Sequence, residues 1–370
     1  MNKTISNILL AFGLSVLVVT SLMVYRFDSE ILPKAAVKKI GFITLGDINV
    51  PGWNSAHYNG IKTACEKLGI ELVYRDNVPE NTGDCPKAIE ELSEAGVGMI
   101  FLCSYDYAAE VFDEVEGKYS HIDFVTNSGE AHARNLTAYF ARMYQGRYLA
   151  GVLAGMRTKS NVIGYVAAIP NCEVCRGINA FTLGVRRTNP QARVVVAWTN
   201  YWEDPPREKE LARRLIEEEG ADLLTYHQDE RAVADTAEEL GVDFIGYNET
   251  LTGYSDHNLT SVICSWERFY ENVIERYLKG ELNSLSNNWI GLEQQAVGLS
   301  EYSPRVTQPM RLAVDKARQE MIDGKELVFS GEIYDLAGNI RCHPGETVSD
   351  NALLESMNWL VKGVEFLGEN

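Results

Sequence analysis

Residues 39–76, KIGFITLGDINVPGWNSAHYNGIKTACEKLGIELVYRD, decide the fold of the chain. KIGFITLG (39–46) is an apolar run typical of a buried strand, and NSAHYNGIKTACEKLG (54–69) has the length of a helix and ends in glycine. IELVYRD (70–76) is a second run of strand-forming residues. A strand, a helix and a strand in this order predict a βαβ unit with two parallel strands.

The same alternation continues along the chain in two successive arrays. The first array adds CPKAIEELSEAG (85–96), MIFLCSY (99–105), AAEVFDEVEGKY (108–119) and IDFVTNS (122–128). The second begins with a long helix at 142–160 that has a small-residue face, and its strands are predicted at 162–169, 192–202, 221–228 and 242–248. Two arrays of similar length predict an α/β fold with two doubly wound parallel-sheet lobes.

The order loosens after residue 258. LTSVICSW (259–266) predicts a strand and RFYENVIERYLKGE (268–281) a helix. VFSGEIYDLAGNIRC (328–342) has an Ala-Gly-Asn turn between alternating residues, which indicates a hairpin. NALLESMNWLVKGVEFLG (351–368) is interpreted as a C-terminal helix that crosses back between the lobes and forms part of a hinge.

These segments also predict the domain boundaries. A signal or anchor segment occupies residues 1–30, the first lobe 38–141 with parts of 260–305, and the second lobe 142–258 with parts of 306–370. We expect the chain to cross between the lobes near 130–142, 248–260 and 300–310, at a hinge that closes on a ligand.

The N-terminus has the composition of an export signal. Lys3 precedes ILLAFGLSVLVVTSLMVY (8–25), an apolar stretch of 18 residues that is just long enough to span a bilayer. No cysteine follows for lipid attachment and no small-x-small cleavage site follows closely, which slightly favours an uncleaved anchor over a cleaved signal. The rest of the chain is therefore predicted to lie in the periplasm or on the extracytoplasmic face of the inner membrane.

The charge of the chain argues against a nucleic-acid partner. Lys and Arg number 34 against 52 Asp and Glu, a formal net charge of −18, and no basic patch stands out. Such a surface repels phosphate backbones. We interpret the charge as a solubility feature of a monomer.

Neither the cysteines nor the histidines form a pattern that indicates an enzyme or a cofactor. Cys172 and Cys175 form a CxxC motif at a predicted helix start, but no second cysteine pair or HxxxH completes a metal site. Structural thiols or a local disulfide are the preferred interpretation of the seven cysteines. GxGxxG, GxSxG and GxxxxGK motifs are missing from the sequence. His227 beside Asp229 is interpreted as a ligand contact or a cap rather than an acid–base pair, and no cofactor is expected.

Aromatic and amide side chains follow the predicted strands of both lobes. In open parallel sheets ligands bind beyond the carboxyl ends of the strands, and two facing lobes would bring those ends to one cleft. Two tryptophans, one from each lobe, could stack on a planar ring while Asn and Asp contact its polar edge. The candidate ligand-binding residues are Asn49, Trp53, Asn54, Ser104, Tyr105, Asn127, Trp202, Asp229, Asn248 and Trp266.

Four long motifs resemble those of the basic membrane protein family of ABC-transporter substrate-binding proteins. They are GWNSAHYNG (52–60), YFARMYQGRYLAGVLAG (139–155), RGINAFTLGVRRTNP (176–190) and WTNYWEDPPREKELA (198–212), and the resemblance runs from about residue 38 to the C-terminus. It implies a type I periplasmic-binding-protein-like fold. The best-understood relatives are purine nucleoside receptor lipoproteins.

The resemblance also implies roles for individual residues. The first-loop aromatic and asparagine of the purine receptors fall on Trp53 and Asn54, and a second stacking aromatic falls on Trp202. The acidic residue that holds the ribose falls on Asn248, and an acidic pair of the first loop becomes Asn49 and Val50. These departures favour a free nucleobase or another planar heterocycle over a nucleoside.

The sequence therefore predicts an extracytoplasmic receptor that binds a purine-like nucleobase or nucleoside between two lobes. Its partners would be this small-molecule ligand and an ABC permease in the membrane. Trp53 and Trp202 are expected to sandwich the ligand, with Asn49, Asn127 and Asp229 at its polar edge. A membrane-anchored sensory or regulatory receptor of the same fold, for a small planar ligand, is the alternative.

Overall fold

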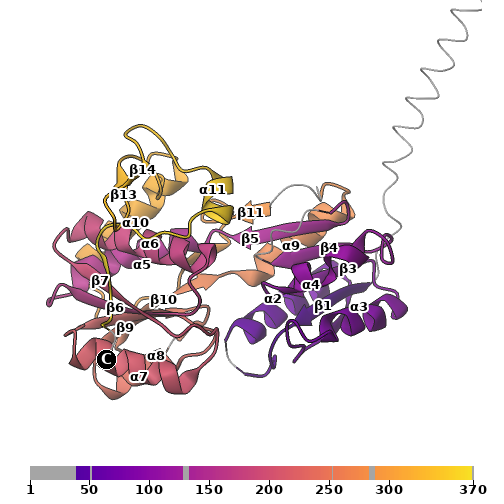
Figure 1. Ribbon diagram of the computed structural model, residues 1–370, viewed down its shortest axis with the longest axis horizontal. Coiled ribbons are helices and arrows are strands. Elements are labelled where there is room, and N and C mark those ends of the chain that lie inside the picture. The colour runs from indigo at the N-terminus through magenta and orange to yellow at the C-terminus, as the bar shows by residue number, and fades with distance from the viewer. Residues whose placement is uncertain (1–38, 51, 128–132, 252, 283–287, 369–370) are drawn as a thin grey trace, which may run out of the picture.

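Two lobes lie side by side, and each contains a mostly parallel sheet with helices on both faces (Figure 1). This computed structural model describes residues 39–50, 52–127, 133–251, 253–282 and 288–368. The predicted α/β class with two doubly wound lobes is confirmed.

The first lobe has a six-stranded sheet in the order β11-β5-β4-β3-β1-β2. Its strands are β1 (Lys39–Thr44), β2 (Glu71–Arg75), β3 (Met99–Cys103), β4 (Asp123–Asn127), β5 (Leu136–Ala141) and β11 (Asn288–Ile290). Side chains that alternate along β1 and β3 face opposite ways, because successive residues of a strand point to opposite faces. Phe42 and Phe101 pack toward α2 (Trp53–Leu68) and α9 (Trp266–Leu278), whereas Ile43 and Ile100 pack toward α3 (Asp84–Glu94) and α4 (Tyr107–Val115).

The second lobe has a seven-stranded sheet in the order β12-β10-β9-β8-β6-β7-β15. Its strands are β6 (Val162–Ala167), β7 (Arg193–Trp198), β8 (Leu223–His227), β9 (Asp243–Tyr247), β10 (Asn258–Cys264), β12 (Val297–Leu299) and β15 (Val364–Phe366). Helices α5 (Met143–Arg157) and α6 (Cys172–Thr188) cover one face, and α7 (Pro205–Glu217) and α8 (Ala232–Glu239) cover the other.

The chain crosses between the sheets at three points. It passes from β5 to α5 at Arg142, from β10 to α9 at Ser265, and from β11 to β12 through residues 291–296. The first crossing falls in the expected range. The other two differ from the expected positions because the pattern of a strand does not say which sheet it joins, and β10 stays in the second sheet up to Cys264. The lobe boundaries drawn from the sequence stay a prediction.

The C-terminal segment differs from its sequence-based interpretation. The hairpin is present, formed by β13 (Ile333–Tyr334) and β14 (Ile340–Cys342) after α10 (Gln308–Ile322). The predicted terminal helix is wrong, because only α11 (Asp350–Glu355) is helical and β15 then pairs with β7. Buried Asn179 explains the extended backbone: its side chain donates to the carbonyl of Trp359 (2.8 Å) and accepts from the N–H of Val361 (2.9 Å). The yellow tail in Figure 1 thus lies on the second lobe.

The predicted membrane segment, residues 8–25, lies outside the described residues. Among the helices that are described, none has the length and apolar character needed to cross a bilayer. All seven cysteines are free thiols, so the local disulfide considered for Cys172 and Cys175 is not formed.

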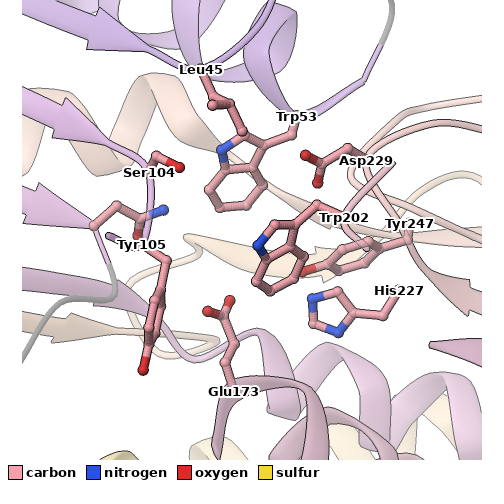
Figure 2. Close-up of a pocket in the computed structure, with 10 residues that line it drawn as sticks. Leu45, Trp53, Ser104, Tyr105, Glu173, Trp202, His227, Asp229 and Tyr247 are labelled. Atoms are coloured by element: carbon pink, nitrogen blue, oxygen red, sulfur yellow. The ribbon is translucent and has the colours of Figure 1, made fainter. Parts of the chain in front are cut away.

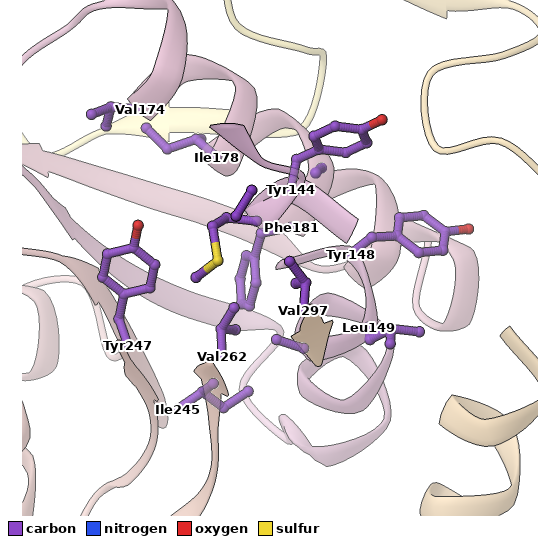
Figure 3. Packing of buried hydrophobic residues seen from close by; sticks show 14 of the residues in the cluster. Tyr144, Tyr148, Leu149, Val174, Ile178, Phe181, Ile245, Tyr247, Val262 and Val297 are labelled. Atoms are coloured by element: carbon purple, nitrogen blue, oxygen red, sulfur yellow. The ribbon is translucent and has the colours of Figure 1, made fainter. Parts of the chain in front are cut away.

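Helices α5 and α6 pack unusually closely because glycines line their contact. A methyl group at Gly151 of α5 would overlap the carbonyl oxygen of Phe181, and one at Gly184 of α6 would overlap the carbonyl oxygen of Tyr148. Figure 3 shows Phe181 in this interface, with Tyr148 and Leu149 on the neighbouring helix. The predicted small-residue face of this segment therefore brings two helix backbones into direct contact.

We predict that Gly151→Ala lowers the free energy of unfolding by about 2–3 kcal/mol, because the new methyl group forces two packed backbones apart. Gly298→Ala is the control, since a methyl group there meets no atom within 4 Å. Urea denaturation measures both variants. Equal, small effects of the two substitutions would show that the helix contact is not tightly packed.

Candidate functional site

A cavity lies between the carboxyl ends of the strands of both sheets, as Figure 2 shows. The space between the two lobes, including the part open to solvent, measures about 450 Å³. The first lobe contributes Leu45, Trp53, Ser104, Tyr105 and Asn127, and the second contributes Glu173, Trp202, His227, Asp229 and Tyr247.

Trp53 forms the first-lobe wall from the first turn of α2. Its ring lies 4.0 Å from that of His57, which in turn lies 3.6 Å from the ring of Trp266 (centroid distances). Buried His57 is fixed by a 2.5 Å hydrogen bond between its Nδ1 and the hydroxyl of Tyr270. Trp266 thus supports Trp53 both through His57 and by a direct edge-to-face contact, with ring centroids 5.3 Å apart.

Trp202 belongs to the loop after β7, and its indole is directed into the same cavity (Figure 2). The loop is held by two contacts: the carbonyl of Trp202 accepts from the N–H of Asp229 at 2.9 Å, and the Asp204 side chain accepts from the N–H of Arg207 at the start of α7. The rings of His227 and Tyr247 continue the wall, with centroids 4.5 Å apart and His227 6.1 Å from Trp202.

Asp229 lines the cavity as a carboxyl group that holds its proton unusually tightly. Burial, and after it the charges of the nearby acids Glu203, Glu208, Glu173 and Glu80, together raise the pKa of Asp229 from 3.8 to about 8. Burial likewise raises the pKa of Glu208 to about 7. A neutral Asp229 can both donate and accept a hydrogen bond, whereas its carboxylate only accepts.

His227 is a neutral imidazole. Burial lowers its pKa well below the ordinary value, and the positive charges of Arg147 and Arg176 lower it further. It therefore offers one donor nitrogen and one acceptor nitrogen rather than a positive charge.

The lobes touch where Gly52 meets Asp229. A methyl group at Gly52 would overlap the carbonyl oxygen of Asp229, and Gly52 has φ = 150°, a backbone conformation that favours glycine. Only a residue without a side chain lets the first loop approach the second lobe this closely.

The structure brings six of the ten sequence-predicted residues to this cavity: Trp53, Ser104, Tyr105, Asn127, Trp202 and Asp229. The two tryptophans come from opposite lobes, as expected.

The other four residues lie elsewhere. Asn49, Asn248 and Trp266 line a neighbouring, more open groove. The expected place of Asn49 at the polar edge beside Asn127 and Asp229 is not observed, because its amide donates to Asp47 at 2.8 Å. The side-chain oxygen of Asn54 accepts from the Thr44 hydroxyl at 2.5 Å.

Sequence reasoning missed four lining residues as site members: Leu45, Glu173, His227 and Tyr247. The sequence indicates His227 as a ligand contact or a cap, Leu45 lies in the loop after β1, and Glu173 lies in the first turn of α6. Tyr247 is the last residue of β9, so only its place at the carboxyl end of a strand could have indicated it.

Comparisons with known proteins agree with the two-lobed receptor architecture. The family model described as ABC transporter substrate-binding protein, PnrA-like, matches residues 37–333. A purine-binding protein of Brucella abortus is 32% identical over 330 residues, which cover 88% of this chain and 93% of the relative.

A second relative carries a different ligand in its name. A Haloferax volcanii protein, named as a glucose-binding protein of an ABC transporter, is 32% identical over 326 residues, covering 88% of this chain and 79% of the relative. The solved structure of an ABC transporter solute-binding protein from Conexibacter woesei superposes with a TM-score of 0.63 at 18% identity, covering 78% of this chain and 97% of that one. This last likeness shows the fold alone.

We predict that Asp229→Asn becomes more stable relative to the parent as the pH rises from about 4 to about 8. Between the ordinary pKa of 3.8 and the raised value of about 8, the folded parent binds more protons than the unfolded chain, so raising the pH destabilises it. The free energy of unfolding of Asp229→Asn, relative to that of the parent, should increase by at least about 1.4 kcal/mol over this range, the equivalent of one pKa unit. This difference should stay constant above pH 8. Urea denaturation at several pH values measures it.

Asp335→Asn is the control, because the pKa of Asp335 is shifted in the opposite direction from that of Asp229. Burial alone would raise the pKa of Asp335, but hydrogen bonds from Asn339 and Arg341 lower it to about 2. Its contribution to stability is therefore complete above pH 4, and the cost of Asp335→Asn should not change between pH 5 and pH 8. A flat profile for Asp229→Asn as well would mean that Asp229 is ionised in the folded protein.

Proposed function

Because the chain belongs to the family of PnrA-like ABC transporter substrate-binding proteins, we propose that it binds a purine-like nucleobase between its lobes and delivers it to an ABC permease. The observation that carries this proposal is the pair Trp53 and Trp202, which enter one cavity from opposite lobes. Two indoles present flat faces to a planar ring, and stacking on an aromatic face contributes about 1–3 kcal/mol for a base.

The polar groups around the tryptophans suit the edge of such a ring. Asp229, Asn127 and Ser104 come from three different strand ends and offer donors and acceptors to a heterocycle. These residues remain near neutral charge when Asp229 is protonated, which fits an uncharged ligand. The purine-binding Brucella relative supports this choice of ligand class.

Glucose is the competing ligand, because sugar rings also lie against aromatic side chains and one relative is named for glucose. We favour a base because two indoles from opposite lobes suit a ring with two flat π faces. In this proposal, residues 8–25 act as an export signal or membrane anchor and place both lobes outside the cytoplasm. The cavity then lies on the side of the membrane where a permease collects its solute.

We predict that Trp202→Ala weakens binding of adenine or hypoxanthine by about tenfold to a hundredfold, the loss of one stacking face. Tyr201→Ala is the matched control, because this neighbouring aromatic is 61% exposed and does not line the cavity. Calorimetry with the two bases, their nucleosides and glucose measures both variants. If the parent binds glucose and no purine, the proposed ligand class is wrong.

Lobe closure gives a separate prediction. Gly52→Ala should weaken binding of the same base by more than about tenfold, because its methyl group holds the first loop away from the carbonyl of Asp229. Gly69→Ala at the other end of α2 is the control: it also has positive φ, yet a methyl group there meets no atom within 4 Å. Equal affinities for the two variants would show that this contact is not needed in the bound state.

A further inference from the structure

A group of buried polar atoms without hydrogen-bond partners lies behind the second-lobe wall of the cavity. Arg147 is fully buried, and two of its nitrogens, Nε and Nη2, have no partner. Nδ1 of His227 and the hydroxyls of Tyr165 and Tyr247 are also buried and unpartnered. Buried polar groups are nearly always hydrogen-bonded, so a cluster of five such atoms calls for an occupant.

These atoms surround one place in the structure. The guanidinium of Arg147 lies 3.8 Å from the ring centroid of Tyr247 and 5.4 Å from that of Tyr165. Gly177 leaves room beside them: a methyl group there would lie 3.5 Å from Nδ1 of His227, 3.6 Å from the Tyr165 hydroxyl and 3.9 Å from Cγ of Arg147. The groups thus come from α5, α6, β6, β8 and β9 and converge.

The charge of this cluster is uncompensated within the described residues. No carboxylate there forms an ion pair with Arg147, whose third nitrogen, Nη1, makes only a 3.4 Å contact to the hydroxyl of Thr225. A buried cation without a counter-charge is costly, because burial removes its water, and the face of the Tyr247 ring replaces only part of that stabilisation. Four of the five unpartnered atoms are hydrogen-bond donors: Nε and Nη2 of Arg147 and the hydroxyls of Tyr165 and Tyr247. Arg147 also supplies a positive charge. The group that would satisfy these atoms is therefore a hydrogen-bond acceptor.

We propose that Arg147, Tyr165, Tyr247 and His227 form a subsite for one acceptor group, either a small anion or a carbonyl oxygen of the bound solute. His227 and Tyr247 line the cavity on one side and contribute to this subsite on the other, so it lies at the second-lobe end of the ligand site. The part of this inference that concerns the solute rests on the proposed function, and the part that concerns a free anion does not.

The first arm of the test uses bromide alone, without solute. Bromide raised from about 1 to about 300 mM in gluconate buffer should increase the Tm of the purified protein by about 2–4 °C if a free anion occupies the subsite. Arg147→Met should abolish this response. Its Tm in gluconate should equal or exceed that of the parent, because an apolar side chain of similar size replaces an unpaired buried charge.

The second arm compares hypoxanthine, which has a carbonyl oxygen, with adenine, which has an amino group at the same position. If the solute supplies the acceptor, Arg147→Met should weaken hypoxanthine at least tenfold relative to adenine, and bromide should compete with hypoxanthine but not with adenine. Tyr165→Phe should likewise weaken binding of hypoxanthine relative to adenine, and it should reduce the competition between bromide and hypoxanthine. Tyr119→Phe is its matched control, because the Tyr119 hydroxyl is also buried and unpartnered but belongs to the first lobe.

The outcomes separate the two proposals. A bromide response that depends on residue 147 identifies a free anion, and a hypoxanthine-selective loss identifies the solute oxygen. If neither the Tm response nor the ratio of base affinities depends on Arg147 and Tyr165, the space holds water only and the subsite is refuted. If the parent binds no base, the proposed function fails while the bromide arm still tests the subsite.

Discussion

Parallel strands place all their carboxyl-end loops at one edge of a sheet, and the site depends on two such edges facing each other. The three crossings, at Arg142, Ser265 and residues 291–296, hold the sheets in this arrangement. None of them supplies a residue of the cavity wall, although Trp266, next to the crossing at Ser265, packs against Trp53. Because the walls of the cavity belong to different lobes, a change in the angle between the lobes would move the two halves of the site relative to each other.

The charges around the cavity keep two of its polar groups neutral. Asp229 lies near Glu203 and Glu208, and the repulsion among these acids adds to the effect of burial on the pKa of Asp229. The positive charges of Arg147 and Arg176 help to keep the imidazole of His227 neutral. His227 and Asp229 are two positions apart in the chain and both line the cavity, so a ligand at this wall meets a neutral imidazole and a neutral carboxyl group.

The sequence predicted the lobes and much of the first-lobe wall because both depend on local signals. Alternating strands and helices indicate parallel sheets, and Trp53 and Trp202 follow strands in loops rich in Gly, Pro and Asn. Trp266 could not be placed this way, since it also follows a strand, and only the structure shows it packed behind Trp53 against His57. The extended tail was missed for a similar reason: its conformation is fixed by Asn179, almost two hundred residues earlier in the chain.

The contact between Gly52 and Asp229 bears on whether the ligand is a base or a nucleoside. Asp229 lines the enclosed cavity, whereas Gly52 lines the open groove that also holds Asn49 and Asn248, so their contact lies where the two spaces meet. Under the proposed function, a base lies between Trp53 and Trp202 on the cavity side of this contact. A ribose attached to it and directed toward Asn248 would have to pass the contact, and Asn248 lacks the carboxylate that would hold its hydroxyls as firmly. Under that proposal, the backbone contact and the amide side chain act in the same direction, toward a free base rather than a nucleoside.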